Sequence, residues 1–166
     1  MIGEDPLNGF RFIVSLDPTD AYLPPAQALL VPLVAAGGFQ ECRGLGADLE
    51  VLTYAEGGRN DYVHQLPVRH SWGRISLRRG LVRDQALWGW YKAGLNRSLG
   101  ARRDGAIIAL DEGGQPAMAW TFRGGLAAKW TGPEFASLNA AVALEGLEIA
   151  HQGIEQVLLK PAVPGL

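Results

Sequence analysis

The side chains best suited to catalysis or metal binding are three histidines and one cysteine: His64, His70, His151 and Cys42. The histidine spacings match neither the HExxH helix nor the paired ligand patterns of zinc sites. Cys42 has no second cysteine for a disulfide or a redox pair, and we interpret it as a small side chain packed in a strand rather than as a nucleophile. We therefore expect no catalytic residue, no metal and no organic cofactor.

Phosphate-binding loops are the next candidates for chemistry, because glycine pairs occur at 37–38, 57–58, 113–114 and 124–125. None of these pairs belongs to a GxxxxGK[ST] or GxGxxG motif, and none separates a predicted strand from a predicted helix. The arginine pairs Arg78–Arg79 and Arg102–Arg103 leave two interpretations open. They are solvated strand ends, or they bind an anion weakly or form ion pairs between subunits.

The composition excludes some classes of protein. The 166 residues fit one domain, predicted to span 1–166. Fifteen basic against 17 acidic residues give a net charge of −2, which argues against a protein that binds nucleic acid through a basic patch. Only 19% of residues are charged, below the usual quarter or so. This low charge indicates either a neutral, loop-rich monomer or a surface that other molecules cover.

Membrane insertion and secretion are not expected. The first residues, MIGEDPLNGF, contain two acids and no apolar run, unlike a secretory signal. Positions 21–40 carry no charge, but Pro24, Pro25 and Pro32 interrupt them and Gly37–Gly38 ends them. A membrane-spanning helix does not tolerate this pattern well, so we interpret the segment as a loop or an irregular hairpin.

Alternating hydrophobic residues predict antiparallel strands along most of the chain. The predicted strands cover 10–16, 39–54, 71–77, 105–110, 118–122 with a continuation over 126–130, and 142–149. Gly44 and Gly46 predict a bend or bulge in the second strand. The DEGGQP sequence at 111–116 predicts a hairpin turn. In the last strand the apolar residues change sides, which predicts a bulge at Glu145–Gly146.

A helical period occurs once, over 84–99, with Asp84 as the expected N-cap. Leu87 and Trp88 fall on its apolar stripe, so Trp88 is expected in the core, together with Trp120 from a strand. Trp90 lies off the stripe and is expected at an interface. A further helical turn is predicted over 133–138. The predicted fold is mainly β: an antiparallel sandwich or barrel of six or seven strands with one flanking α-helix.

Three segments lack a strand or helix period. An apolar insertion covers about 19–36, and a short tail covers about 157–166. The third segment, 55–69, has turn-forming glycines at 57–58 and a proline at 67, so we expect a long polar excursion between two strands. The insertion packs either on its own subunit or against a neighbour, and we expect it to determine the position of the protein in an assembly.

Several short motifs follow one another along the chain: FRFIV at 10–14, GFQECRGL at 38–45, YAEGGRNDY at 54–62, LPVR at 66–69, ISLRRG at 75–80, LWGW at 87–90, the strand at 105–111, KWTGP at 129–133 and EIAH at 148–151. In their residues and order, these motifs resemble the tail tube proteins of T4-like contractile phages. Each motif is weak alone. Together they run in order from Phe10 to about Gly153.

The resemblance implies a structural protein rather than an enzyme. Family members form hexameric rings that stack into the inner tube of contractile phage tails and extracellular contractile injection systems; the type VI secretion tube protein is a structural relative. The implied partners are further copies of the chain, a sheath protein, baseplate hub and tube-terminating proteins, and DNA or effector cargo in the lumen. Contacts between subunits or rings are expected from the excursion and nearby arginines: Glu56, Gly57, Gly58, Asn60, Asp61, Tyr62, Arg69, Arg78 and Arg79.

Several alternatives remain open at this stage. The resemblance fits a phage tail or an injection system, and the bulk tube or a specialised tube-initiating ring at the baseplate end. The expected location is the cytoplasm during assembly and then a phage tail or injection particle, without stable membrane association. The alternative from a different class is a small split-barrel enzyme that binds a flavin or a phosphate, which would need a convergent polar pocket that the scattered arginines do not suggest.

Overall fold

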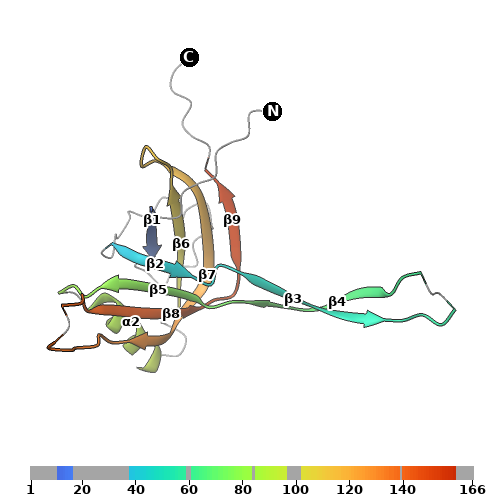
Figure 1. Ribbon diagram of the computed structural model, residues 1–166, viewed down its shortest axis with the longest axis horizontal. Helices are drawn as coiled ribbons and strands as arrows, with labels where there is room; N and C mark the ends of the chain where they lie inside the picture. The colour runs from blue at the N-terminus through green and yellow to red at the C-terminus, as the bar shows by residue number, and fades with distance from the viewer. Residues whose placement is uncertain are drawn as a thin grey trace, which may run out of the picture.

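The computed structural model describes residues 11–16, 38–58, 61–83, 85–96, 102–138 and 140–159, which form a two-layered body with a long projecting arm (Figure 1). The predicted insertion at about 19–36 and the last part of the predicted tail lie outside the described residues. Asn60 and the expected N-cap Asp84 also lie outside them. Among the described residues, no helix is long and apolar enough to cross a membrane.

The body is an antiparallel sheet of seven strands in the order β1-β6-β7-β8-β5-β2, with β9 paired to β7. The strands are β1 (Phe12–Leu16), β2 (Phe39–Arg43), β5 (Ile75–Gly80), β6 (Arg103–Leu110), β7 (Pro116–Thr131), β8 (Leu144–Ala150) and β9 (Ile154–Leu158). One helix, α2 (Ala86–Asn96), occurs in the described part of the chain. The predicted mainly β, antiparallel fold with a flanking helix is confirmed. The sequence analysis did not predict strand β9. The segment predicted as a tail from about 157 therefore begins inside a strand.

Strand β7 belongs to two layers of the body. Its first half pairs with β6 and β9, and residues 126–131 pair with β8. The bend lies at Gly124, whose φ of +57° suits glycine, and at Gly125, where a Cβ would lie 2.6 Å from the Phe122 ring. The predicted break at Gly124–Gly125 is therefore a bend within one strand. We call β1, β6, β9 and the first half of β7 the first layer, and β2, β5, β8 and the second half of β7 the second layer.

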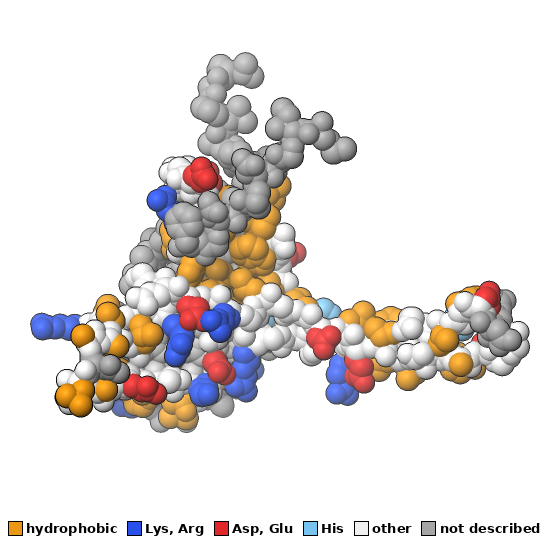
Figure 2. Space-filling model, viewed as in Figure 1, with side chains coloured by type: hydrophobic (Ala, Val, Ile, Leu, Met, Phe, Trp, Pro, Cys, Tyr) orange, Lys and Arg blue, Asp and Glu red, His pale blue; other side chains and the backbone are white. Residues whose placement is uncertain are grey.

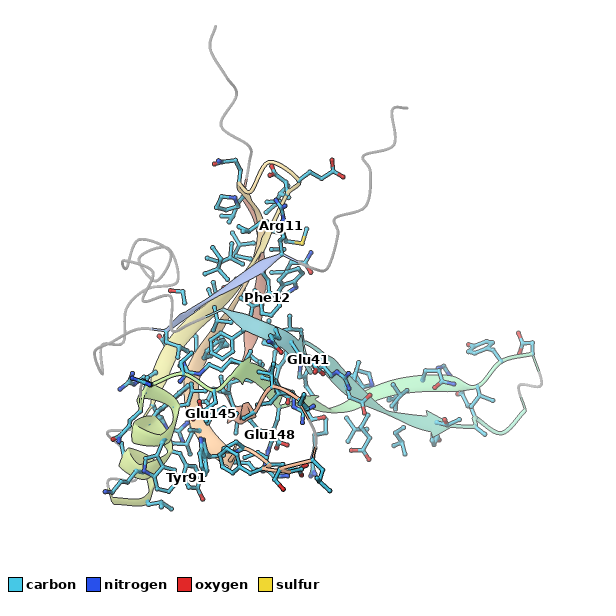
Figure 3. The ribbon with its side chains drawn as sticks, turned by 60° about the vertical axis from the view of Figure 1, so that its left-hand side comes forward. Arg11, Phe12, Glu41, Tyr91, Glu145 and Glu148 are labelled. Atoms are coloured by element: carbon cyan, nitrogen blue, oxygen red, sulfur yellow. The ribbon has the colours of Figure 1, made fainter. Side chains whose placement is uncertain are left out.

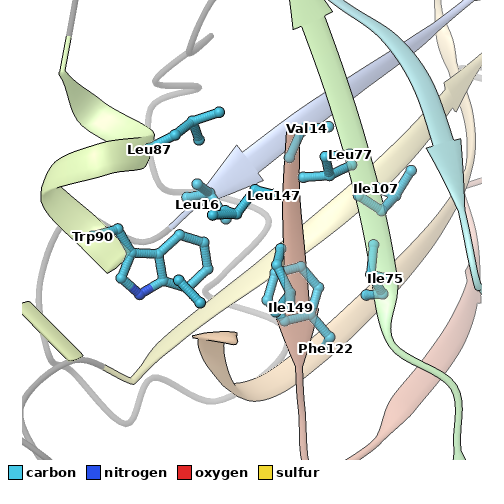
Figure 4. Packing of buried hydrophobic residues seen from close by; sticks show 11 residues of the cluster. Val14, Leu16, Ile75, Leu77, Leu87, Trp90, Ile107, Phe122, Leu147 and Ile149 are labelled. Atoms are coloured by element: carbon cyan, nitrogen blue, oxygen red, sulfur yellow. The ribbon is translucent and has the colours of Figure 1, made fainter. Parts of the chain in front are cut away.

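The core fills the space between the two layers and the helix (Figure 4). Its members are all aliphatic or aromatic: Val14, Leu16, Ile75, Leu77, Leu87, Trp90, Ile107, Phe122, Ala127, Leu147 and Ile149. The two helix tryptophans have the opposite roles to those predicted. Trp90 is 2% exposed and Trp88 is 38% exposed, because the buried helix face runs through Leu87, Trp90 and Tyr91. Trp120 is only half-buried.

Two other local predictions are wrong. Strand β8 pairs with β5 without a register shift, so Glu145–Gly146 is not a bulge. The apolar pattern changes sides there because the buried face continues through Glu145, a charged residue that is 3% exposed. Residues 133–138 form an irregular loop with a turn rather than a helical turn.

The arm is a two-stranded sheet of β3 (Ala47–Tyr54) and β4 (His64–Trp72) that extends away from the second layer (Figure 1). The single strand predicted over 39–54 is thus two strands, β2 and β3, separated at Gly44, whose φ is +87°. The predicted loop over 55–69 is partly strand, because β4 starts at His64. Pro67 lies inside β4, opposite Val51 at a register shift, which is a position where proline is tolerated in a sheet.

Candidate functional site

The arm presents apolar side chains to solvent along its whole length (Figure 2). Every residue of β3 is exposed, and all residues of β4 beyond His64 are exposed. The large exposed apolar side chains of the arm are Leu49, Val51, Leu52, Tyr54, Tyr62, Val63, Leu66, Val68 and Trp72. An isolated two-stranded hairpin is only marginally stable in water. The arm therefore has the properties of a segment that packs against another molecule.

The arm tip comprises residues 54–58 and 61–64, and it brings together most of the predicted contact residues. Glu56 Oε2 lies 3.1 Å from His64 Nε2, and the His64 ring meets the Tyr62 ring edge-on at a centroid distance of 5.1 Å. Gly58 turns the chain with a φ of +96°, and a Cβ at Gly57 or Gly58 would meet no atom within 4 Å. Asp61 is exposed beside Tyr62. The described residues of the tip thus combine a polar contact between Glu56 and His64 with an exposed aromatic side chain, Tyr62.

The base of the arm is fixed by a backbone contact. A Cβ on Gly44 would lie 1.8 Å from the Arg74 carbonyl oxygen, so only glycine allows the chain ends of the arm to approach this closely. The N–H of Gly73 donates to the Gly46 carbonyl at 3.1 Å. These contacts hold the arm where it leaves β2 and enters β5.

His151 also anchors the base of the arm. Its Nδ1 accepts a hydrogen bond from the Gly153 N–H at 3.2 Å, so its Nε2 carries the proton that is donated to the Gly73 carbonyl at 2.8 Å. The ring centroid of Trp72 lies 6.0 Å from that of His151. The histidine considered for catalysis is therefore held in one tautomer by the backbone and positions the arm.

The predicted contact arginines lie in three different places. Arg69 is on the arm, opposite Glu50 in the register. Arg78 is on the outer face of the second layer, half-exposed, with its Nη1 4.0 Å from Glu41 Oε2. Arg79 is 0% exposed, so its predicted contact with another subunit is wrong. It points into the body because neighbouring residues of a strand alternate between the two faces of the sheet.

The outer face of the second layer is polar and carries several ion pairs (Figure 3, where Glu41 and Glu148 are labelled). Glu148 accepts from Arg74 Nη1 at 3.3 Å and lies 3.9 Å from Lys129 Nζ. Glu41 pairs with Arg43 on the same strand. Exposed pairs of this kind contribute little to stability, so they indicate a hydrated face rather than a packed one.

Open strand edges occur at both sides of the body. Within the described residues, β1 pairs only with β6, β9 only with β7, and β2 only with β5. The second half of β7 pairs with β8 on one side only. Unpaired backbone donors and acceptors at such edges can accept a strand from another chain.

The loop between β7 and β8 is a second exposed apolar surface, which the sequence analysis did not identify. We call its described residues, 132–138 and 140–143, the end loop. Phe135 is 81% exposed, Leu138 100% and Val142 70%. The end loop surrounds a hollow of about 730 Å³, which we call the end hollow and which Arg78 also lines. Large apolar residues do follow Gly132–Pro133 in the sequence, but their exposure cannot be inferred from the sequence alone.

The described residues hold little that could support chemistry. They contain no group of three or more His, Cys, Asp or Glu side chains placed to hold a metal ion. Burial raises the pKa of the Cys42 thiol from 9.0 to about 11, which disfavours the thiolate that a nucleophile requires. What the arrangement does offer is a projecting arm with exposed apolar side chains, a hollow lined by both polar and apolar residues, and open strand edges, all of which suit protein–protein contacts.

Comparison with known protein families assigns the chain to a family. The family described as T4-like virus tail tube protein gp19 matches residues 8–155. The chain belongs to this family. The resemblance found in the sequence motifs is thereby confirmed over most of the chain. Comparison with curated protein sequences found no match.

Solved structures with the same fold include chains of the anti-feeding prophage and of an extracellular contractile injection system. A chain in the cryo-EM structure of the anti-feeding prophage (AFP) baseplate is 24% identical, with a TM-score of 0.77, and the match covers 96% of this chain and 100% of that one. A chain of the PVC sheath–tube complex in the extended state is 19% identical, with a TM-score of 0.73 and 94% of both chains covered. A chain of the AFP tube-terminating cap is 18% identical, with a TM-score of 0.76, 96% of this chain and 95% of that one covered.

Proposed function

We propose that this tail tube family protein is the structural inner-tube subunit of a contractile injection system or a contractile phage tail. In this function, copies form hexameric rings that stack into a tube, a sheath surrounds the tube, and DNA or protein cargo passes through the lumen. The observation that carries the proposal is the arm: a two-stranded hairpin with apolar side chains exposed on an isolated subunit of this family. The 6-fold symmetry named for the AFP baseplate supports six copies per ring.

The open strand edges support ring closure. In a ring, the unpaired edge of one subunit would face the unpaired edge of the next, and backbone hydrogen bonds would continue the sheet around the axis. Closure removes edges that otherwise invite uncontrolled aggregation. No enzymatic step is part of the proposal, because the described residues supply contacts and not a catalytic constellation. Assembly would begin in the cytoplasm, with baseplate hub and tube-terminating proteins at the two ends.

A specialised ring at the baseplate end is the alternative. The observation in its favour is the match to the AFP baseplate chain, which covers all of that chain. The insertion at about 19–36, which lies outside the described residues, is proposed to determine the position of the protein along the tube by packing on a neighbouring subunit. If the purified protein makes long tubes alone, it is the bulk subunit; if it stops at single rings and caps a tube of another protein, it is the specialised ring.

The experiment is electron microscopy and light scattering of the purified chain over a wide concentration range. We expect rings and tubes as the concentration rises. A comparison variant replaces residues 47–72 with Asn-Gly, since the Gly73 N–H already donates to the Gly46 carbonyl at the base of the arm. This armless variant should melt at nearly the wild-type temperature and form no tubes. A wild-type protein that stays monomeric at every concentration would overturn the proposal.

A further inference from the structure

The arm and the end loop lie at opposite ends of the second layer. The arm starts beyond Arg43 and returns before Ile75, at one end of strands β2 and β5. At the other end, Gly80 pairs with Leu144, and the end loop joins β7 to β8 there. Figures 1 and 2 show the arm and the loop between β7 and β8 at the two extremes of the long axis. A surface at each end of one sheet is the arrangement needed for copies that bind head to tail.

The two surfaces resemble each other in chemistry. The end loop exposes Phe135, Leu138 and Val142, and the arm tip exposes Tyr54, Tyr62 and Val63. Both sets would leave water when they pack together, and aromatic side chains are enriched at the centres of protein interfaces.

Charge adds a preference for one orientation. Arg78 lines the end hollow with its side chain half-exposed. The arm tip carries Glu56 and Asp61, both exposed. A carboxylate of the tip placed near the Arg78 guanidinium would favour insertion of the tip over docking of the flat side of the arm. Glu134 also lines the hollow, so the favourable orientation is one that places the carboxylates of the tip nearer to Arg78 than to Glu134.

We propose that the arm tip of one copy docks in the end hollow of the next copy. The proposal rests on the proposed function and names the surface that receives the arm. Strand β3 has eight residues, so the arm extends about 26 Å at roughly 3.3 Å per residue. This reach lets one body contact another without bringing their sheets together. A contact between two different surfaces of the same chain can repeat from copy to copy, and in an open assembly such as a stack of rings it leaves free arms at one end and free hollows at the other.

The first experiment changes each surface separately. The loop variant combines Phe135→Ser with Leu138→Ser, and the arm variant combines Tyr62→Ser with Val63→Ser. All four side chains are exposed in the isolated chain, so melting temperatures should stay at the wild-type value. The concentration needed for tube formation should rise by about tenfold or more in each variant, as for the loss of an interface anchor. The control is Leu95→Ser on α2, which removes a leucine that is 67% exposed and lies outside both surfaces, and it should assemble normally.

The combined loop-and-arm variant tests whether the two surfaces meet. If they do, the second change adds little, because the contact is already lost in the first. If the loop and arm changes together raise the concentration needed for tube formation by the product of their separate effects, each surface has a different partner. That result would overturn the proposal. Tubes of the loop variant that form at the wild-type concentration would overturn it as well, while leaving the proposed function intact. A wild-type chain that forms no rings or tubes would count against the proposed function itself.

A thiol cross-link gives a direct readout. In a Cys42→Ser background, Tyr62→Cys and Phe135→Cys are introduced in the same chain, and a short thiol cross-linker is added to assembled material. A ladder of covalent multimers is expected from the head-to-tail contact. Replacing Phe135→Cys by Lys92→Cys, on the exposed part of α2, should abolish the ladder. Cross-linking that is equal for both pairs would reject the assigned contact.

Discussion

Arg79 on β5 and Glu145 on β8 face each other inside the body, with the Arg79 Nε 3.1 Å from Glu145 Oε2 and both side chains almost fully buried. The second carboxylate oxygen, Oε1, accepts the indole N–H of Trp130 at 2.9 Å. The Arg79 guanidinium also lies 5.8 Å from the centre of the Phe39 ring. A buried charge pair thus joins β2, β5, β7 and β8.

Removing one member of this pair should be severely destabilising. Arg79→Met leaves the Glu145 carboxylate buried without its charge partner, and we expect a loss of about 3–5 kcal/mol in the free energy of unfolding. The neighbouring Arg78→Met is the matched control; it removes an exposed ion pair and should cost less than about 1 kcal/mol. Urea unfolding followed by tryptophan fluorescence measures both. Equal losses for the two variants would contradict this account of the interior.

Gly44→Ala should disturb the base of the arm. The new Cβ would lie 1.8 Å from the Arg74 carbonyl oxygen, at a φ of +87° that other residues rarely adopt, so the backbone must move. We expect a loss of roughly 1–3 kcal/mol and faster amide exchange along β3 and β4. Gly46→Ala serves as the control, because its Cβ would meet nothing within 4 Å. Similar exchange rates in the two variants would show that the contact at Gly44 does not hold the arm.

Gly58→Val should affect assembly and leave the body stable. The residue has a φ of +96°, which costs a β-branched side chain roughly 1–2 kcal/mol, but this strain is confined to the arm tip. Gly57→Val adds the same side chain without the positive φ and without any contact within 4 Å. We expect near-normal melting for both, and fewer tubes for Gly58→Val. Normal tubes from Gly58→Val would mean that the shape of the tip is not needed.

Cys42 should react slowly in the folded protein. Burial raises the pKa of its thiol from 9.0 to about 11, so at pH 8 the thiolate fraction falls by about 100-fold. The raised pKa stabilises the folded state below pH 9, and this contribution is lost as the pH rises from 9 towards 11. Iodoacetamide labelling of folded and urea-unfolded protein between pH 7 and 10 measures the difference. Equal labelling rates in the two states would show that the thiol is not protected.

Charged side chains that are buried by contacts between distant parts of the chain explain why some predictions from the sequence patterns were wrong. The alternation over 142–149 predicts a bulge only if every buried position is apolar, and Glu145 breaks that assumption because its partner Arg79 is 66 residues away in the chain. Arg79 lies on the same strand face as the buried Ile75 and Leu77, but nothing near it in the sequence shows the charge partner that its burial requires. Similarly, the helix period alone could not show that Trp90 faces the core, since a helix rotated by one residue has almost the same apolar stripe.

Local chemistry was sufficient where backbone geometry decides the structure. The Asp111–Gln115 turn forms as predicted, with the Gly114 N–H donating to the Asp111 carbonyl at 3.0 Å and the Gln115 N–H to the Asp111 carboxylate at 2.8 Å. Gly44 marks the bend between β2 and β3 for the same reason. The end loop could not be predicted as a surface, because exposure of Phe135 and Leu138 depends on what the rest of the chain leaves uncovered.

The length of β7 has a mechanical consequence. Its 16 residues cross from the first layer to the second without a loop, held by β6 and β9 before the bend and by β8 after it. A force that pulls the layers apart is therefore borne by a covalent backbone and by rows of hydrogen bonds that must break together. Layers joined only by side-chain packing would slide past each other under the same load. The body should respond to impact as one stiff elastic unit.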